Sequence, residues 1–575
     1  MKRLLCVLCV LCGLSFSSYA LDRHAFTFTD YNLTVTLTPA SSGFEVAGKI
    51  TLRNDSSEPQ KLAVLQISSS LDWKSVTVAG KPVQYVSQPY SSDIDHTGAL
   101  TEAIVTLPVP VAPSATVELQ VVYAGTITQD ATRLTRIGVP EKTALASDWD
   151  RIGEPFSAVR GVGYVTWYPI STEAASLTFE NQLFDEIGAW KRREIESQMQ
   201  MHLALKNVSG EVVPNVSSVW QCFHPDSAPT PSGCIWHQRD DWKSPAFTLG
   251  NYEGLSRAGL QIDYLAGRQP LAEDHARVIT ALTPFVTQWF GEPKQPIHIV
   301  ELAWPDANPW ESGALFLTPL KQVLSEPLQL QLVHQLTHTA LPSPRPWIFE
   351  GVAQFAQALE RERQAGRRAA IEFMEAQSAL LVALQQPNLP DAPGRKDTTP
   401  PRRLEPLATT SDEIFYRLKA MRVWWMLRDL VGDAALQRAL HNYKAQDDGE
   451  PSYLQRLLEA ETQRKLEWFF DDWVYRDRGL PDFRIDAVYP RAILAGGYTL
   501  TITVENSGEA GAEVPVTVET AHGQITRRLE VRGRQKAVIR IEVPEAPRRV
   551  IVNDGSVPEL DRTNNSFDVQ IPAKQ

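Results

Sequence analysis

The stretch from 331 to 354, QLVHQLTHTALPSPRPWIFEGVAQ, decides how the middle of this chain folds. It predicts a helix carrying His334 and His338, a turn broken by prolines, and a second helix carrying Glu350. Residues four apart lie on one helix face, with Cβ atoms roughly 5–6 Å apart. Two imidazoles placed in this way can hold one face of a metal ion, and a carboxylate from the following helix can supply a third ligand.

Two His and one Glu, with an open fourth position, form a known catalytic zinc set. The usual HExxH motif has a glutamate directly after the first histidine to act as general base, and this chain has Gln335 there. The spacing also has a plain structural interpretation. A buried helix whose two histidines form ordinary hydrogen bonds has the same sequence pattern. The His pair alone therefore leaves both interpretations open.

The first twenty residues, MKRLLCVLCVLCGLSFSSYA, have the pattern of a secretory signal. Lys2 and Arg3 precede an apolar run, and Ser18 and Ala20 are the small residues that a signal peptidase reads. No later stretch reaches eighteen apolar residues, so we expect an extracytoplasmic protein with no transmembrane segment after signal removal. The net charge of −12 becomes −14 because the signal carries two basic residues and no acid. An acidic chain without a basic run is a poor candidate for binding nucleic acid.

Two cysteines, Cys222 and Cys234, remain after the signal is removed. In an oxidising compartment they predict a disulfide that closes a short, turn-rich loop. A structural zinc site is the alternative, because His224 and His237 lie beside them in the sequence.

Composition along the chain indicates a multi-domain α+β protein. Short alternating strands predict an N-terminal β-saddle or sandwich over 21–252, after the signal at 1–20. Helices dominate 253–480 and are interrupted by a Pro-rich loop over 385–410. Short strands return over 481–575 and suggest an immunoglobulin-like sandwich.

Several sequence segments, which follow one another along the chain, resemble segments of the gluzincin metallopeptidases of the membrane alanyl aminopeptidase family and of the related peptidase-MA-like proteins. YNLTVTLTP and SVTVAGKPV are similar to that family's β-saddle, and WFGEPKQPIHIVEL to the strand entering its thermolysin-like domain. VHQLTH and WIFEGVAQF follow as the zinc motif, and DGSVPELDRTNN resembles the end of its small β-domain. The similarity runs over nearly all of the chain after the signal.

The resemblance implies that His334, His338 and Glu350 bind one zinc ion and that an extended peptide is the partner. In that family the acid after the first His takes a proton from water, which the amide of Gln335 does not do near neutral pH. We therefore expect hydrolysis to be weak or absent. The alternative is an active zinc metallopeptidase or aminopeptidase with a substitute base, for which Glu311 is the nearest acid.

Two further positions depart from the family. Gly313, Ala314 and Leu315 lie where the family carries its substrate-binding strand, and they are our candidates for contacting a peptide. The acid that grips a free amine is replaced by Phe316, so selection for free N-termini is not expected. The tyrosine that steadies the oxyanion aligns with Arg417, so both the neighbouring Tyr416 and Arg417 itself are candidates for that role.

Overall fold

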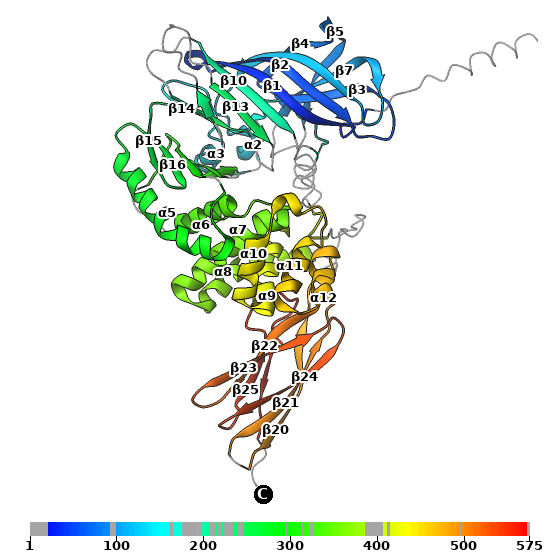
Figure 1. The fold of residues 1–575 in the computed structure, drawn as a ribbon, viewed down its shortest axis with the longest axis vertical. Helices are drawn as coiled ribbons and strands as arrows, with labels where there is room; N and C mark the ends of the chain where they lie inside the picture. Colours follow the sequence, from blue (N-terminus) through cyan, green and yellow to red (C-terminus); the bar gives the residue numbers. More distant parts are fainter. Residues whose placement is uncertain are drawn as a thin grey trace, which may run out of the picture. The chain divides into compact units, whose positions relative to one another are not determined.

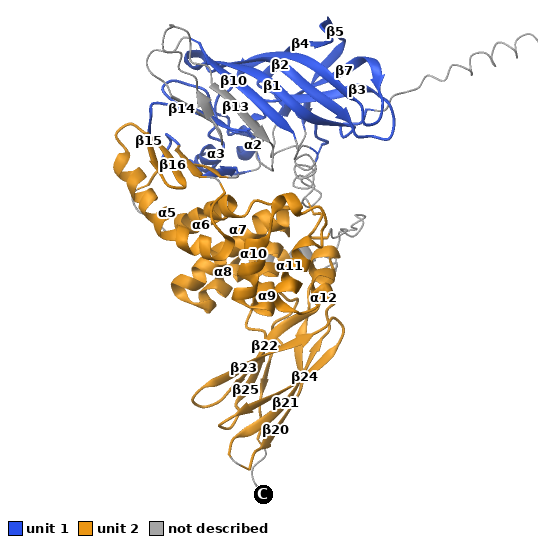
Figure 2. Ribbon diagram, in the orientation of Figure 1, with its two compact units in different colours: residues 1–253, 302–312 blue, residues 254–301, 313–575 orange. Residues whose placement is uncertain are grey.

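The computed structural model describes residues 21–571 apart from 92–98, 137, 162–164, 175–192, 194–196, 207–212, 217–219, 223–233, 240–244, 295, 313, 322–325, 386–405, 411–414 and 495. The chain forms two compact units (Figures 1 and 2). Unit 1 comprises 1–253 and 302–312, and unit 2 comprises 254–301 and 313–575. The sequence predicts domain boundaries at 252/253 and 480/481, and these boundaries stay predictions. The structure divides the chain into two compact units, in which 254–301 groups with 313–575.

Unit 1 is built on an eight-stranded sheet with the order β12-β13-β10-β1-β2-β8-β4-β5. Its strands pair antiparallel except β1 with β10, which run parallel. Two three-stranded sheets, β3-β7-β6 and β11-β14-β9, accompany it. The strands span Phe26–Thr38 (β1), Gly43–Asn54 (β2), Gln60–Ser68 (β3), Leu71–Val78 (β4), Lys81–Pro82 (β5), Tyr85–Ser91 (β6), Ala99–Val111 (β7), Thr116–Thr126 (β8), Ser157–Val159 (β9), Gln198–Leu205 (β10), Val213–Val216 (β11), Trp220–Cys222 (β12), Cys234–Arg239 (β13) and Phe247–Gly250 (β14).

Alternating side chains explain these strands. Along β1, Leu33, Val35 and Leu37 are fully buried and alternate with more exposed positions, as expected for a sheet with one face in a core. Two short helices, α2 (Thr132–Thr135) and α3 (Glu141–Ser147), follow β8.

The segment 302–312 packs in unit 1 although the strands on either side of it in sequence belong to unit 2. The Trp304 ring contacts the rings of Trp149 and Phe156, and the Trp149 indole N–H donates to the Asn308 carbonyl at 3.0 Å. These aromatic contacts account for the grouping, which the sequence did not indicate.

Unit 2 begins with parallel strands. β16 (Leu260–Leu265) pairs with β17 (Ile297–Glu301), and β17 pairs with β19 (Leu315–Thr318). Helix α5 (Gln269–Phe290) forms the crossover from β16 to β17. β15 (Tyr252–Arg257) and β18 (Trp310–Ser312) lie at the boundaries between the units in sequence.

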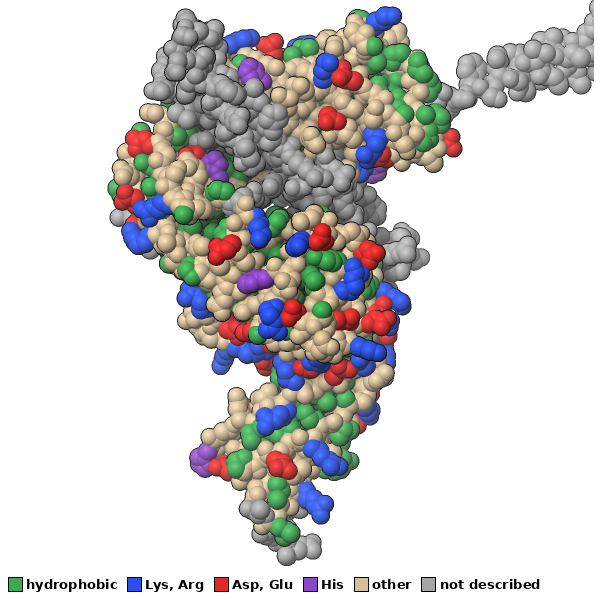
Figure 3. All heavy atoms as spheres, viewed as in Figure 1, with side chains coloured by type: hydrophobic (Ala, Val, Ile, Leu, Met, Phe, Trp, Pro, Cys, Tyr) green, Lys and Arg blue, Asp and Glu red, His purple; other side chains and the backbone are tan. Residues whose placement is uncertain are grey.

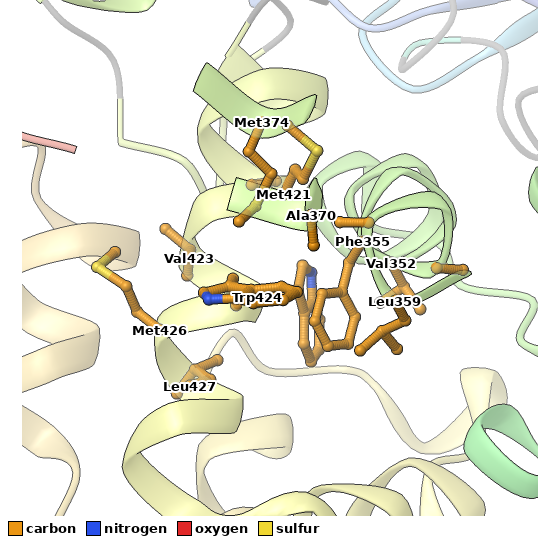
Figure 4. Close-up of a cluster of buried hydrophobic side chains, with 14 of the residues drawn as sticks. Val352, Phe355, Leu359, Ala370, Met374, Met421, Val423, Trp424, Met426 and Leu427 are labelled. Carbon is orange, nitrogen blue, oxygen red and sulfur yellow. The ribbon is translucent and has the colours of Figure 1, made fainter. Parts of the chain in front are cut away.

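The helical part of unit 2 packs around α7. Figure 4 shows side chains of three helices meeting in one buried cluster: Val352, Phe355 and Leu359 of α7, Met374 of α8, and Met421 and Trp424 of α9. Trp424, Trp425, Phe469, Phe470 and Trp473 are buried in this core, and Trp468 packs against it. The helices span Glu326–Ala340 (α6), Pro346–Ala365 (α7), Arg367–Gln385 (α8), Ala420–Val431 (α9), Asp433–Asn442 (α10), Tyr453–Thr462 (α11) and Glu467–Phe470 (α12), with π-helical turns at Phe415–Lys419 (η3) and Asp471–Tyr475 (η5).

The end of unit 2 is a sandwich of two antiparallel sheets, β20-β21-β24 and β23-β22-β25-β26. Its inner faces share the core of the helical part. The buried Arg422 of α9 donates to the Gly555 carbonyl at 2.9 Å, which joins the helices to the sandwich. The strands span Phe483–Ala492 (β20), Tyr498–Asn506 (β21), Ala512–Glu519 (β22), Gln524–Val531 (β23), Lys536–Val543 (β24), Arg549–Val552 (β25) and Ser566–Asp568 (β26).

Acidic and basic side chains are interspersed on the face of unit 2 that Figure 3 shows. Unit 2 also contains many ion pairs, such as Arg367 with Asp429 and Arg428 with Asp433.

Three sequence expectations fall outside the described residues. These are the signal at 1–20, most of the Pro-rich loop over 385–410, and the side chains of the two cysteines. The backbone places Cys222 on β12 directly opposite Cys234 on β13, and their disulfide stays a prediction. Among the helices that the structure describes, none is long and apolar enough to span a membrane.

Candidate metal centre

The helix α6 carries both histidines on a buried face. His334 and His338 are each 2% exposed, and Gln335 between them is fully buried. α6 ends at Ala340, two residues before Pro342, which has no N–H to continue the helix. The next helix, α7, starts at Pro346 in the first-turn position that suits proline, and Glu350 lies in its second turn.

The turn between α6 and α7 is held by a polar network. The Ser343 hydroxyl lies 2.8 Å from the Tyr443 hydroxyl, and Tyr443 donates to Asp448 at 2.5 Å. Arg345 donates to the same Asp448 carboxylate at 2.8 Å. Because Ser343, Tyr443 and Asp448 are all buried, this network fixes the angle at which α7 leaves α6.

The structure brings His334, His338 and Glu350 together. The two Nε2 atoms lie 3.0 Å apart, and each lies 3.6 Å from one oxygen of Glu350: His334 from Oε2 and His338 from Oε1. The donor atoms of all three residues lie within 4.8 Å of one another. The His338 ring also stacks on Phe349, with ring centroids 3.9 Å apart, which holds its orientation.

This spacing suits a tetrahedral metal ion. Two metal–nitrogen bonds of roughly 2.0–2.1 Å at a tetrahedral angle place the nitrogens about 3.3 Å apart. The observed separations of 3.0 and 3.6 Å bracket that value. Two imidazoles and one carboxylate also form a chemically suitable donor set for zinc, so the residues present fit a metal of this kind.

Charge at Glu350 is set by its neighbours. Burial raises its pKa, but the Arg417 guanidinium and the imidazoles of His338 and His334 outweigh burial and hold the pKa well below the usual range. Arg417 donates from Nε to Oε2 of Glu350 at 3.1 Å. Glu350 is therefore ionised at neutral pH, which is the form that binds metal.

The other predicted site residues have different surroundings. Tyr416 is 7% exposed and belongs to the hydrophobic core of unit 2, whereas its neighbour Arg417 contacts Glu350. Ala314 and Leu315 are 3% and 2% exposed, and Leu315 pairs with His298 of β17. Gly313 lies outside the described residues, so the binding role of these three stays a prediction.

Some contacts were not visible in the sequence. The Arg417–Glu350 pair joins residues 67 positions apart. The only sequence signal for it is that Arg417 is basic and Glu350 is acidic. His298, which had no partner visible in sequence, lies 2.6 Å from Asp263 on the neighbouring strand. The buried His275 contacts the Leu271 carbonyl within its own helix at 2.9 Å. Glu311 is part of β18 and groups with unit 1.

Comparison with known proteins gives structural matches alone. A variant of the M1 zinc metallopeptidase from Deinococcus radiodurans matches with 17% identity and a TM-score of 0.49, over 80% of this chain and 97% of the other. The variant bound to a Tyr-Ser-Ala substrate matches with 17% identity and a TM-score of 0.48, over 80% and 97%. The same organism's M1 zinc metallopeptidase matches with 16% identity and a TM-score of 0.48, over 80% and 96%. No protein-family model and no curated protein matches the chain. At these values the likeness assigns neither a family nor an activity to this chain.

Proposed function

We propose that this chain is an exported protein of the gluzincin metallopeptidase type that binds one zinc ion and extended peptide segments, and hydrolyses them weakly or not at all. His334, His338 and Glu350 are its ligands. The observation that carries the proposal is the convergence of their donor atoms, at 3.0 and 3.6 Å, beside the fully buried Gln335.

A zinc ion bound by these residues would act as a Lewis acid toward a carbonyl oxygen or a water molecule. The chain's own residues orient the ligand atoms toward the ion, but they provide no strong general base to take a proton from water. His334 and His338 present their Nε2 atoms to one point, and α7 brings Glu350 to the same point. The Gln335 amide can hydrogen-bond water but is not a base near neutral pH. Loss of a positioned general base typically lowers a rate by about 10²–10⁴.

The remaining parts of the proposal have separate support. The N-terminal sequence pattern favours export and an extracytoplasmic location. The opposed positions of Cys222 and Cys234 in the β12–β13 pair favour a disulfide. The two-sheet C-terminal sandwich favours an immunoglobulin-like domain. The peptide ligand rests on the resemblance of the sequence to the aminopeptidase family.

The test compares four forms of the full chain, purified from the exported fraction: native, Gln335→Glu, His334→Ala and Glu350→Ala. Bound zinc is measured by mass spectrometry, and turnover by release from a library of internally quenched peptides. We expect about one zinc per native chain, little turnover, and loss of zinc in both ligand variants. Gln335→Glu is expected to raise turnover by about 10²–10⁴ while leaving zinc content unchanged.

Two outcomes would contradict the proposal. If the native chain holds no zinc, the ligand assignment fails. If it hydrolyses peptides efficiently and loses that activity in His334→Ala, it is an active peptidase, and Glu311→Gln then shows whether Glu311 is the substitute base.

A further inference from the structure

Arg417 contacts the carboxylate that the proposed metal centre depends on. Its Nε atom donates to Oε2 of Glu350 at 3.1 Å, and the two side chains are 31% and 18% exposed. The same Oε2 lies 3.6 Å from His334, whereas Oε1 lies 3.6 Å from His338. The two oxygens of Glu350 are therefore not equivalent, because Arg417 engages one of them.

A close approach of two helices brings Arg417 to this place. Gly351 directly follows Glu350, and a Cβ added there would lie 2.5 Å from the Ala420 Cβ at the start of α9. The absence of a side chain at Gly351 thus allows η3 and α9 to lie directly against α7. The indole N–H of Trp424 donates to the Trp347 carbonyl at 3.1 Å, and the two rings stack with centroids 5.3 Å apart.

A buried ion pair anchors the turn that carries Arg417. Lys419 at the end of η3 lies 2.6 Å from Asp477, and their side chains are 1% and 0% exposed. The aromatic rings of Phe415 and Trp473 lie 5.9 and 5.8 Å from the lysine Nζ. π-helical turns are rare and occur frequently at functional sites.

Two effects of Arg417 on a bound cation oppose each other. Its positive charge repels the cation, whereas its hydrogen bond restricts the rotation of Glu350. Groups that orient a metal ligand in this way typically contribute about 10–100-fold to metal affinity. Repulsion is the smaller effect here, because Arg417 is paired with the carboxylate and nearly a third of its side chain is exposed to solvent screening.

We propose that Arg417 is a positioning residue of the metal centre, which holds Glu350 through Oε2 so that Oε1 is presented to the ion together with the two imidazoles. This inference rests on the proposed zinc site. It assigns to Arg417 a role in metal affinity and coordination in place of a role as oxyanion donor.

The experiment measures metal binding by the full chain in native, Arg417→Ala and Arg417→Lys forms. Arg438→Ala is the matched control, because Arg438 forms a similar pair with Glu461, at 2.6 Å, away from the site. Zinc affinity is measured by competition with a chromophoric chelator, and coordination by the visible absorption of the cobalt-substituted protein. Thermal unfolding of each apoprotein reports on folding.

We expect Arg417→Ala to weaken zinc binding about 10–100-fold and to change the cobalt spectrum, with Arg417→Lys between it and native. Arg438→Ala is expected to behave as native in both measurements. An Arg417→Ala protein that binds zinc as tightly as native or more tightly, with an unchanged cobalt spectrum, would overturn the inference and leave the zinc site intact. A native chain that binds no zinc would overturn both this inference and the proposed function.

Discussion

The substitution Gly351→Ala tests whether the close approach of α7 and α9 builds the site. The added Cβ would lie 2.5 Å from the Ala420 Cβ, 3.1 Å from Trp424 Nε1 and 3.2 Å from Trp424 Cδ1. Carbon atoms in contact prefer about 3.5–4.0 Å, so the two helices must separate by about 1 Å. Neither neighbour can rotate away, because the Ala420 Cβ is fixed to the backbone and Trp424 is stacked on Trp347.

The magnitude follows from two opposing contributions. Overpacking a close-packed core by one methyl group costs about 1–3 kcal/mol. Replacing glycine by alanine inside a helix recovers about 0.5–1 kcal/mol. We therefore expect the free energy of unfolding to fall by up to about 2.5 kcal/mol. The Arg417–Glu350 distance of 3.1 Å is also expected to exceed hydrogen-bond length, which would weaken zinc binding about tenfold.

The assay is urea unfolding followed by tryptophan fluorescence, together with the chelator competition for zinc. Gly449→Ala is the control, because a Cβ at Gly449 meets no atom within 4 Å. It is expected to leave the unfolding midpoint and the zinc affinity unchanged. If Gly351→Ala matches native in both measurements, the helix separation does not set the geometry of Glu350 and Arg417, and the reasoning is refuted.

Two other predictions concern the stability of unit 2. Burial raises the pKa of Glu559 from the ordinary 4.5 to about 7, despite hydrogen bonds from Phe483, Asn553 and Asn565. The folded state therefore binds this proton more tightly than the unfolded chain, and the free energy of unfolding should fall as pH rises from about 4.5 to about 7, by up to about 3 kcal/mol. Native and Glu559→Gln proteins are compared by thermal unfolding at pH 5 and pH 8, and an equal difference at both pH values would contradict this. Lys419→Met removes the cation that compensates the buried Asp477, so the free energy of unfolding should fall by about 3–5 kcal/mol, measured by urea unfolding. Adding Asp477→Asn should recover much of that loss, and a double variant as unstable as the single one would show that the ion pair is not the cause.

Local sequence determined the elements of the site. The His-x-x-x-His spacing, Pro342 and Pro346 predicted two helices joined by a short turn, and the structure has them at Glu326–Ala340 and Pro346–Ala365. Backbone periodicity and the missing N–H of proline act within a few residues, so a single sequence expresses them directly. The same holds for the alternating strands at both ends of the chain.

The tertiary structure alone decided how these elements meet. Gly351 indicates a close approach of α7 and α9 only once Ala420 is known to face it. Arg417 forms its hydrogen bond with Glu350 only because η3 packs against α7. The grouping of 302–312 with unit 1 depends likewise on Trp304 meeting Trp149 and Phe156. These contacts join residues far apart in the chain, and their energies come from packing and burial, which no local pattern of letters records.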